Sequence, residues 1–336
     1  MLFRSTINVP DCYADPRFNP EVDRRTGYRT RALVTVPLIG LEDELVGVMQ
    51  LLNPHHKPSF DTSDVQLAEI VASQAAAAIQ RAQLIQTREA KLKLDRDLAL
   101  ARQIQHDVLP AKLPICEGYD LAGFSQPADE TGGDLYDVIP LPLPLSPDFG
   151  VLPGEDEKGV VAEDGLILFL ADATGHGIGP ALSVTQVRAM LRIAIRLDIE
   201  IDPLLMQVNN QLVEDLGSRR FVTAFLGKLD RKTHRVMYHA AGQGPILHYE
   251  AATKTTRILG ASSLPLGVMP DPPMDRPEDI VLGPGDVLAL MTDGFYEYLG
   301  PGNDMMGKQR VADSLTKHAD KNAADILQAI LQDTLR

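Results

Sequence analysis

The sequence contains no tryptophan and only two cysteines, Cys12 and Cys116, among its 336 residues. The two cysteines stand far apart and lack the paired spacing of zinc ligands, which suits a reducing compartment. Neither begins the C-x5-R loop of a thiol phosphatase, because Phe18 and Ala122 stand where the arginine would be. We therefore expect no cysteine chemistry and a cytoplasmic location.

Basic residues are the minority among the charged residues. Lys and Arg number 32 against 46 Asp and Glu, which gives a net charge of −14. No block rich in Lys or Arg compensates locally, so nucleic acid and anionic membrane are not expected as partners. No apolar run approaches the ~20 residues that span a bilayer. With 44% hydrophobic and 23% charged residues, the composition is typical of a globular chain of roughly two domains.

The N-terminal part contains two β-rich runs, "RALVTVPLIG" and "ELVGVMQLLN", joined by the polar turn "LEDE". This pattern predicts a β-hairpin. Together with the residues that follow, it resembles the second half of a GAF domain, and the resemblance covers residues 28 to about 90. It implies a partial GAF-like sensor domain with an α/β sheet over residues 1–60.

A helix is predicted from Asp61 to Pro110, since no Gly and no internal Pro interrupts this stretch. Asp61 and Ser63 are both candidate caps, and Ser63 and Gln66 have capping-box spacing. A helix of this length exceeds most helices within globular domains. We therefore expect a connecting signalling helix over residues 61–110.

Two arrangements of this helix remain open. It could form a homodimeric coiled coil, although Arg81 and Arg88 fall on the seam of the simplest heptad register. Alternatively, it could be a single solvated helix. If its phase controls activity, inserting two or four residues near Thr87 should change turnover.

The stretch from Leu166 to Leu191 combines an aliphatic run, a glycine cluster and an amphipathic segment. A strand, a glycine turn and a helix could bind a nucleotide phosphate. Asp172 argues against this interpretation, because its carboxylate would repel a phosphate unless a cation stood between them. Gly175, Gly177 and Gly179 give G-x-G-x-G rather than G-x-G-x-x-G. The pattern therefore favours a metal site.

Three acids stand beside glycines or at the ends of apolar strands: Asp134 in "GGD", Asp172 in "LADATG" and Asp293 in "TDG". Each could simply cap a turn, where Asp is favoured. If they converge, two carboxylates about 4 Å apart repel by roughly 4 kcal/mol at an effective dielectric near 20. Such a cluster implies bound cations, and all-oxygen ligation favours Mg²⁺ or Mn²⁺ over zinc.

After Pro110 the chain is predicted to be α+β, with a surface loop over the Pro-rich stretch 140–165. Residues 98–299 resemble a SpoIIE-type, metal-dependent serine/threonine phosphatase of the PPM superfamily. The ordered motifs that carry the resemblance are "GGDLYD", "ADATGHGIGPAL", "FVTAFLGKLD", "YHAAGQGP", "LPLGV" and "GDVLALMTDGFYE". The resemblance implies an α-β-β-α sandwich over residues 111–336.

The resemblance also implies the site. Asp134 and Asp172 would bridge two Mn²⁺ or Mg²⁺ ions, the carbonyl of Ala173 would add a ligand, and Asp293 would hold one ion. The implied reaction is hydrolysis of phosphoserine or phosphothreonine by a water that the two metals activate. No covalent phosphoenzyme is needed.

Further residues could support the ligands. His176, beside Gly175, could orient a phosphate or stabilise its turn, and Gly294 follows the third acid. Asp137 could support a metal-bound water or be a surface hairpin carboxylate. Gln243 stands where the family often carries His, which is expected to change the local hydrogen bonding.

The family's catalytic domain finishes with a "G-x-x-D-D-x-T" turn and a final strand, whose Asp completes one metal site. Nothing of that kind follows the helix near Leu335. We therefore expect a C-terminally incomplete domain, weaker binding of one ion and an unprotected sheet edge.

By the same resemblance the substrate would be a phosphorylated protein, such as a STAS-fold anti-sigma-factor antagonist in bacterial partner-switching signalling. The alternative is a catalytically degenerate phosphatase-fold domain that acts as a regulatory binding module. A diguanylate cyclase is disfavoured, because "GGDLY" lacks the second acid and the Phe of GGDEF. A P-loop is disfavoured as well, because "GNDMMGKQ" ends in Gln where a hydroxyl residue is needed.

Overall fold

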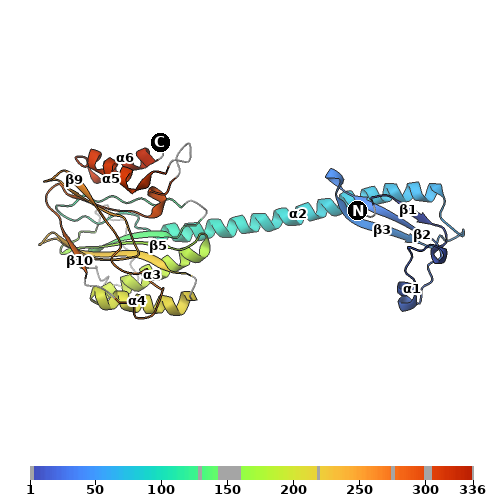
Figure 1. Cartoon of the computed structure of the whole chain (residues 1–336), viewed down its shortest axis with the longest axis horizontal. Coiled ribbons are helices and arrows are strands. Elements are labelled where there is room, and N and C mark those ends of the chain that lie inside the picture. Colours follow the sequence, from blue (N-terminus) through green and yellow to red (C-terminus); the bar gives the residue numbers. More distant parts are fainter. Residues whose placement is uncertain are drawn as a thin grey trace. The chain divides into compact units, whose positions relative to one another are not determined.

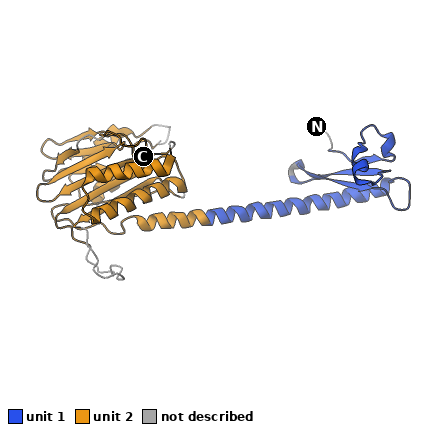
Figure 2. Ribbon diagram, turned by 90° about the horizontal axis from the view of Figure 1, so that it is seen from below, with its two compact units in different colours: residues 1–96 blue, residues 97–336 orange. Residues whose placement is uncertain are grey.

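The computed structural model describes residues 4–127, 131–142, 160–217, 220–273, 277–298 and 305–334. The chain divides into two compact units, residues 1–96 and 97–336 (Figure 2). In the part that is described, no helix has both the length and the apolar character to cross a membrane. Most of the predicted loop, residues 143–159, lies outside the described residues.

The first unit contains a three-stranded antiparallel sheet of order β1-β2-β3. The predicted hairpin is present as β2 (Leu33–Ile39) and β3 (Leu45–Leu52). Ahead of it, the chain adds strand β1 (Ile7–Val9) and the short helix α1 (Glu21–Thr26), which the sequence did not predict.

The long helix α2 spans Thr62–Val108, and the boundary between the two units falls within it. Asp61 caps it, because its carboxylate accepts from the backbone N–H groups of Ser63 (2.9 Å) and Asp64 (3.1 Å). The Asp61 N–H donates in turn to the Asp64 carboxylate at 2.9 Å. The reciprocal pair is therefore Asp61 with Asp64, and the prediction of Ser63 with Gln66 was wrong.

Small residues on the first turns of α2 allow this helix to lie closely against the sheet of the first unit. They repeat every four residues along α2 and pack against every second residue of β2, because one turn of helix and two residues of strand advance by a similar distance. The resulting buried cluster contains Ala68, Ala72 and Ala76 from α2 with Val34, Val36 and Leu38 from β2.

The second unit contains two antiparallel sheets, one of five strands in the order β10-β7-β6-β5-β4 and one of three in the order β11-β8-β9. Every strand pair in both sheets is antiparallel. The strands are β4 (Asp134–Leu141), β5 (Gly165–Ala173), β6 (Val222–Asp230), β7 (Arg235–Ala241), β8 (Ile246–Glu250), β9 (Thr255–Leu259), β10 (Glu278–Val281) and β11 (Val287–Leu290).

Helices cover the outer face of each sheet (Figure 1). α3 (Ile178–Arg196) and α4 (Ile201–Leu216) lie on the five-stranded sheet, while α5 (Gly307–His318) and α6 (Ala323–Thr334) lie on the three-stranded sheet. Strand alternation separates the layers, since adjacent Phe225 and Leu226 belong to different cores. The predicted α-β-β-α sandwich is confirmed.

Candidate metal centre

Asp134 and Asp172 face each other across two neighbouring strands. Asp134 begins β4, and in the antiparallel register it lies directly opposite Asp172 of β5. Residues opposite each other in such a pair project from the same face of the sheet. Their carboxyl groups lie close enough for each to shift the pKa of the other, and the Thr292 hydroxyl donates to Asp134 Oδ2 at 2.9 Å.

The pair holds more negative charge than its surroundings neutralise. Burial, followed by the charges of Asp134 and Asp293, raises the pKa of Asp172 to about 7. Burial and the charge of Asp293 also raise the pKa of Asp134, although the Thr292 hydroxyl acts in the opposite direction. Crowded acids of this kind are stabilised by a bound cation.

Asp293 approaches this pair from the other sheet. It follows β11 and begins the short 3-10 helix η4 (Asp293–Phe295), where its side chain is exposed. Its charge acts on both other acids, yet no three Asp, Glu, His or Cys side chains of the described segments form a ready metal-ligating group. The structure thus brings two predicted ligands into contact and the third within electrostatic range.

The backbone beside the pair also presents an oxygen. A Cβ atom at Gly133 would collide with the carbonyl oxygen of Ala173 and lie 2.9 Å from Asp172 Oδ1. Only glycine therefore leaves this carbonyl open beside the carboxylates. Two carboxylates and a carbonyl form an all-oxygen donor set that fits Mg²⁺ or Mn²⁺. Sequence reasoning did not assign this role to Gly133, although the "GGD" motif contains the signal.

Gln243 joins β6 to the segment that follows β11, next to the pair. Its buried side-chain amide accepts from the Thr223 hydroxyl at 2.9 Å and donates to the Met291 carbonyl at 2.8 Å. Thr223 of β6 lies opposite Asp172 in the sheet. Gln243 thereby fixes the segment that leads into Asp293. Both the oxygen and the nitrogen of the Gln243 amide are therefore hydrogen-bonded.

The structure does not bring Asp137 to the pair. It lies three residues after Asp134 in β4 and so projects from the opposite face. Its fully buried carboxylate accepts from Arg192 Nε and Nη2 at 2.6 and 2.8 Å and lies 2.7 Å from Arg188 Nε. Asp137 is not a surface carboxylate, because it is buried between two arginines of α3.

The predicted glycine turn between β5 and α3 is present. Gly175 and Gly177 adopt φ angles of 96° and 88°, which favour glycine. His176 between them is exposed, and Gly294 is exposed in η4. Thr174 fastens the turn, because its hydroxyl accepts from the Phe221 N–H at 3.2 Å. The roles of His176 and Gly294 stay predictions.

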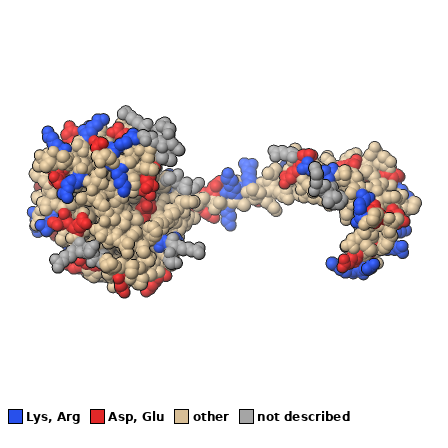
Figure 3. Space-filling model, in the orientation of Figure 1, with Lys and Arg blue, Asp and Glu red and all other residues tan. Residues whose placement is uncertain are grey.

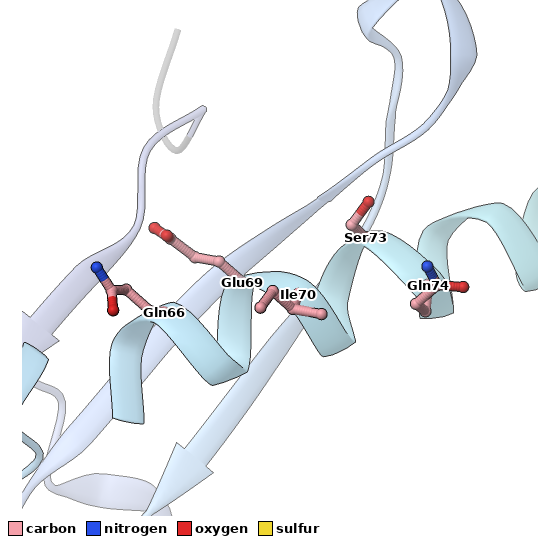
Figure 4. A pocket seen from close by; sticks show the side chains of 5 residues that line it. All are labelled: Gln66, Glu69, Ile70, Ser73 and Gln74. Atoms are coloured by element: carbon pink, nitrogen blue, oxygen red, sulfur yellow. The ribbon is translucent and has the colours of Figure 1, made fainter. Parts of the chain in front are cut away.

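One pocket of the first unit is lined by Gln66, Glu69, Ile70, Ser73 and Gln74, all from α2 (Figure 4). Because no second element contributes to this lining, the pocket is no enclosed ligand site. On the face of the second unit shown in Figure 3, described basic and acidic side chains are interspersed.

Each of the two parts of the chain matches a known protein family. Residues 162–336 match the family Stage II sporulation protein E (SpoIIE), and residues 2–79 match the GAF domain. The GAF match extends the resemblance in the sequence to include β1 and α1.

Two curated bacterial relatives cover most of this chain. Phosphoserine phosphatase RsbU of Bacillus subtilis is 22% identical over 245 residues, which cover 73% of this chain and 66% of RsbU. Protein IcfG of Synechocystis sp. is 23% identical over 268 residues, 71% of this chain and 38% of IcfG. The chain thus spans less than two thirds of either relative.

A solved structure, the SiaA-PP2C domain of Pseudomonas aeruginosa, shares the fold. It is 22% identical, with a TM-score of 0.56, and the match covers 73% of this chain and 90% of that domain. The SpoIIE match includes β5, with its acid and glycine turn, and the segment that carries Asp293. Because this match covers more than half of the residues, the chain belongs to the SpoIIE family.

Proposed function

We propose that this chain is a metal-dependent phosphatase that hydrolyses phosphoserine or phosphothreonine on a partner protein. The observation that carries the proposal is the pair of carboxyl groups of Asp134 and Asp172, which lie in contact beside the open carbonyl of Ala173. A site that serves only packing gains nothing from two uncompensated acids in contact. Similarity to RsbU, a phosphoserine phosphatase by its printed name, supports the substrate class.

In this proposal Asp134, Asp172, Asp293 and the Ala173 carbonyl hold two Mn²⁺ or Mg²⁺ ions. Such ions, when bound, supply a water of lowered pKa and neutralise phosphoryl oxygens. The chain's own residues orient the ligands. The Thr292 hydroxyl holds one oxygen of Asp134, Oδ2, in place beside Asp172.

The further residues of the proposal act on these ligands. Gln243 fixes the Met291 carbonyl, and thereby the start of the segment that carries Asp293. Gly133 keeps the Ala173 carbonyl uncovered. Gly175 allows the turn after Asp172 to direct the backbone toward α3. These residues position the acids and take no part in bond breaking.

The proposal extends to the biological setting through the family resemblance. The substrate would be a phosphorylated regulator of the STAS fold in a partner-switching pathway, and the location would be the cytoplasm. Both cysteines are free thiols in the structure, which suits a reducing compartment.

A homodimer through the helix of residues 61–110 is also part of the proposal. Val71, Ile85 and Leu92 are exposed on α2 and are separated by multiples of seven residues. Such spacing provides one seam position of a coiled coil. Arg81 and Arg88 fall on the other seam position, which predicts a weak dimer.

Calorimetric Mn²⁺ titration, together with p-nitrophenyl phosphate turnover, tests the function. We expect Mn²⁺ binding and turnover in the wild type, and the loss of both in Asp172→Asn. Asp164→Asn is the matched control, because this exposed acid of the same region pairs only loosely with Lys232 at 3.5 Å. A folded wild type that binds no Mn²⁺ and has no turnover would support a regulatory binding module instead.

A further inference from the structure

The last turns of α2 are attached directly to the loop that precedes Asp134. Gln105 is buried, with 8% of its surface exposed. Its Nε2 donates to the Gly132 carbonyl at 2.6 Å. The Gly132 N–H donates back to Gln105 Oε1 at 3.2 Å. One side-chain amide therefore satisfies both backbone groups of a single residue, as a neighbouring β-strand would.

The attachment lies two residues from the metal-ligand candidate. The next residue, Gly133, accepts through its carbonyl from the Ala173 N–H at 3.1 Å. The backbone leading into Asp134 is thus held on one side by α2, through Gln105, and on the other by β5, through Ala173. Displacement of either contact changes where β4 begins, and hence the position of the Asp134 carboxylate.

The side chain of Thr131, the described neighbour on the N-terminal side, does not take over this task. Thr131 precedes the clamped residue and is buried, yet its hydroxyl has no hydrogen-bond partner among the described residues. Gly132 is only partly exposed, and a buried backbone group left without its hydrogen bond costs roughly 1 to 3 kcal/mol. The glutamine amide is therefore the anchor that keeps this peptide in one orientation.

We propose that Gln105 is a positioning residue for the metal centre: it clamps the Gly132 peptide and thereby fixes the Asp134 carboxylate for metal binding. The inference rests on the proposed function, because it takes Asp134 as a ligand. It also gives α2 a physical route to the site, since any rotation or shift of its last turns must act on Gly132 through two hydrogen bonds.

The test compares three variants of the full chain. Gln105→Met keeps the size and helix propensity of the side chain but removes both hydrogen bonds. Gln105→Ala is the second variant, in case the thioether does not fit. Gln103→Ala is the matched control, because Gln103 is exposed two residues earlier on the same helix.

Two measurements apply to each variant. Amide hydrogen exchange of the metal-free protein reports on the Gly132 clamp, and Mn²⁺ calorimetry reports on the site. In Gln105→Met and Gln105→Ala we expect exchange at Gly132 to become at least about ten-fold faster and the Kd for Mn²⁺ to rise about ten-fold. Gln103→Ala should match the wild type in both measurements.

The outcomes separate this inference from the proposed function. If the wild type binds Mn²⁺ through Asp134, as an Asp134→Asn variant would show, but both Gln105 variants bind it with unchanged affinity, the inference is wrong and the function stands. Faster exchange at Gly132 without any change in Kd also overturns it. If the folded wild type binds no Mn²⁺, both proposals fail.

Discussion

Two aspartates of one strand have opposite surroundings. Asp134 contacts a second carboxyl group, whereas Asp137 lies between two guanidinium groups on the other face of β4. An odd separation along a strand places side chains on opposite faces. One face of β4 therefore carries an uncompensated charge for a cation, and the other carries an internal ion pair that stabilises the fold.

Replacing Asp137 by Ala should destabilise the second unit strongly. The change leaves the partly buried cations of Arg188 and Arg192 without their anion, and breaking such a pair costs about 3 to 5 kcal/mol. Urea unfolding should show this loss. Asp279→Ala is the control, because its pair with Arg235 is exposed at 3.3 Å and such pairs contribute about 0 to 1 kcal/mol. Equal effects of the two changes would contradict the assignment.

Replacing Asp172 by Asn should stabilise the metal-free protein at pH 8. The folded-state pKa of Asp172 is raised to about 7 from 3.8, so the folded state binds the proton more tightly than the unfolded state does. The wild type therefore loses stability as the pH rises from about 4 to about 7. Asn removes this penalty, and because solvent screens the partly exposed group, we expect a gain of about 1 kcal/mol, well below the full value of such a shift.

Urea unfolding in EDTA at pH 5 and pH 8 checks this sign. The gain of Asp172→Asn should be larger at pH 8 than at pH 5, where the wild-type carboxyl is protonated. A variant that is less stable than the wild type at pH 8 would show that the acidic pair is not under electrostatic strain.

The candidate ligands could be predicted from the sequence, but the residues that hold them could not. Asp134, Asp172 and Asp293 each stand beside glycine or at a strand end, which is a local signal. The Thr292 hydroxyl meets Asp134 from 158 positions away. Gln105 and Gly132 are likewise brought together only by the fold. Contacts of this kind depend on tertiary packing, which no local pattern encodes.

At the scale of elements, α2 and β4 are joined by the Gln105 clamp, so the phase of α2 should matter. Inserting two residues after Thr87 rotates the preceding part of the helix by about 200° relative to Gln105, whereas seven residues add almost two whole turns. We expect the two-residue insertion to change phosphatase turnover and the seven-residue insertion to preserve it. Identical turnover in both insertions would exclude control through helix phase.

The elements themselves differed in how well they could be predicted. The long run without Gly or Pro predicted α2, and two β-rich runs joined by a polar turn predicted the hairpin. Its cap was assigned to the wrong pair because Asp61 and Ser63 both favour that position. Lys57 favours Asp61 as the cap, since it forms ion pairs with both Asp61 and Asp64. Strand β1 has three residues, too few to show a period.

At the scale of the whole molecule, metal should stabilise one unit selectively. All proposed ligands belong to residues 97–336, and a ligand that binds only the folded state adds about 2.7 kcal/mol at a concentration of 100 Kd. We expect Mn²⁺ to raise the Tm of the second unit in scanning calorimetry while the transition of the first unit stays constant. A rise of both transitions, or of neither, would contradict this.

The layered architecture was predicted from the order of motifs, and the strands were found where the aliphatic runs lie. The first unit was predicted less completely, because the resemblance to a GAF domain became visible only from residue 28. Upstream residues form β1 and α1, whose short lengths leave little trace in composition. The family resemblance thus predicted the large buried layers better than the small peripheral elements.

The Thr292 hydroxyl bond to Asp134 spans the two sheets of the sandwich. The candidate centre is therefore complete only when the two halves of the sandwich are closed against each other. A substitution that loosens the inter-sheet core, for example at Phe225, would release cations before it unfolds the chain. Metal occupancy would then report whether the two sheets of the sandwich are packed against each other.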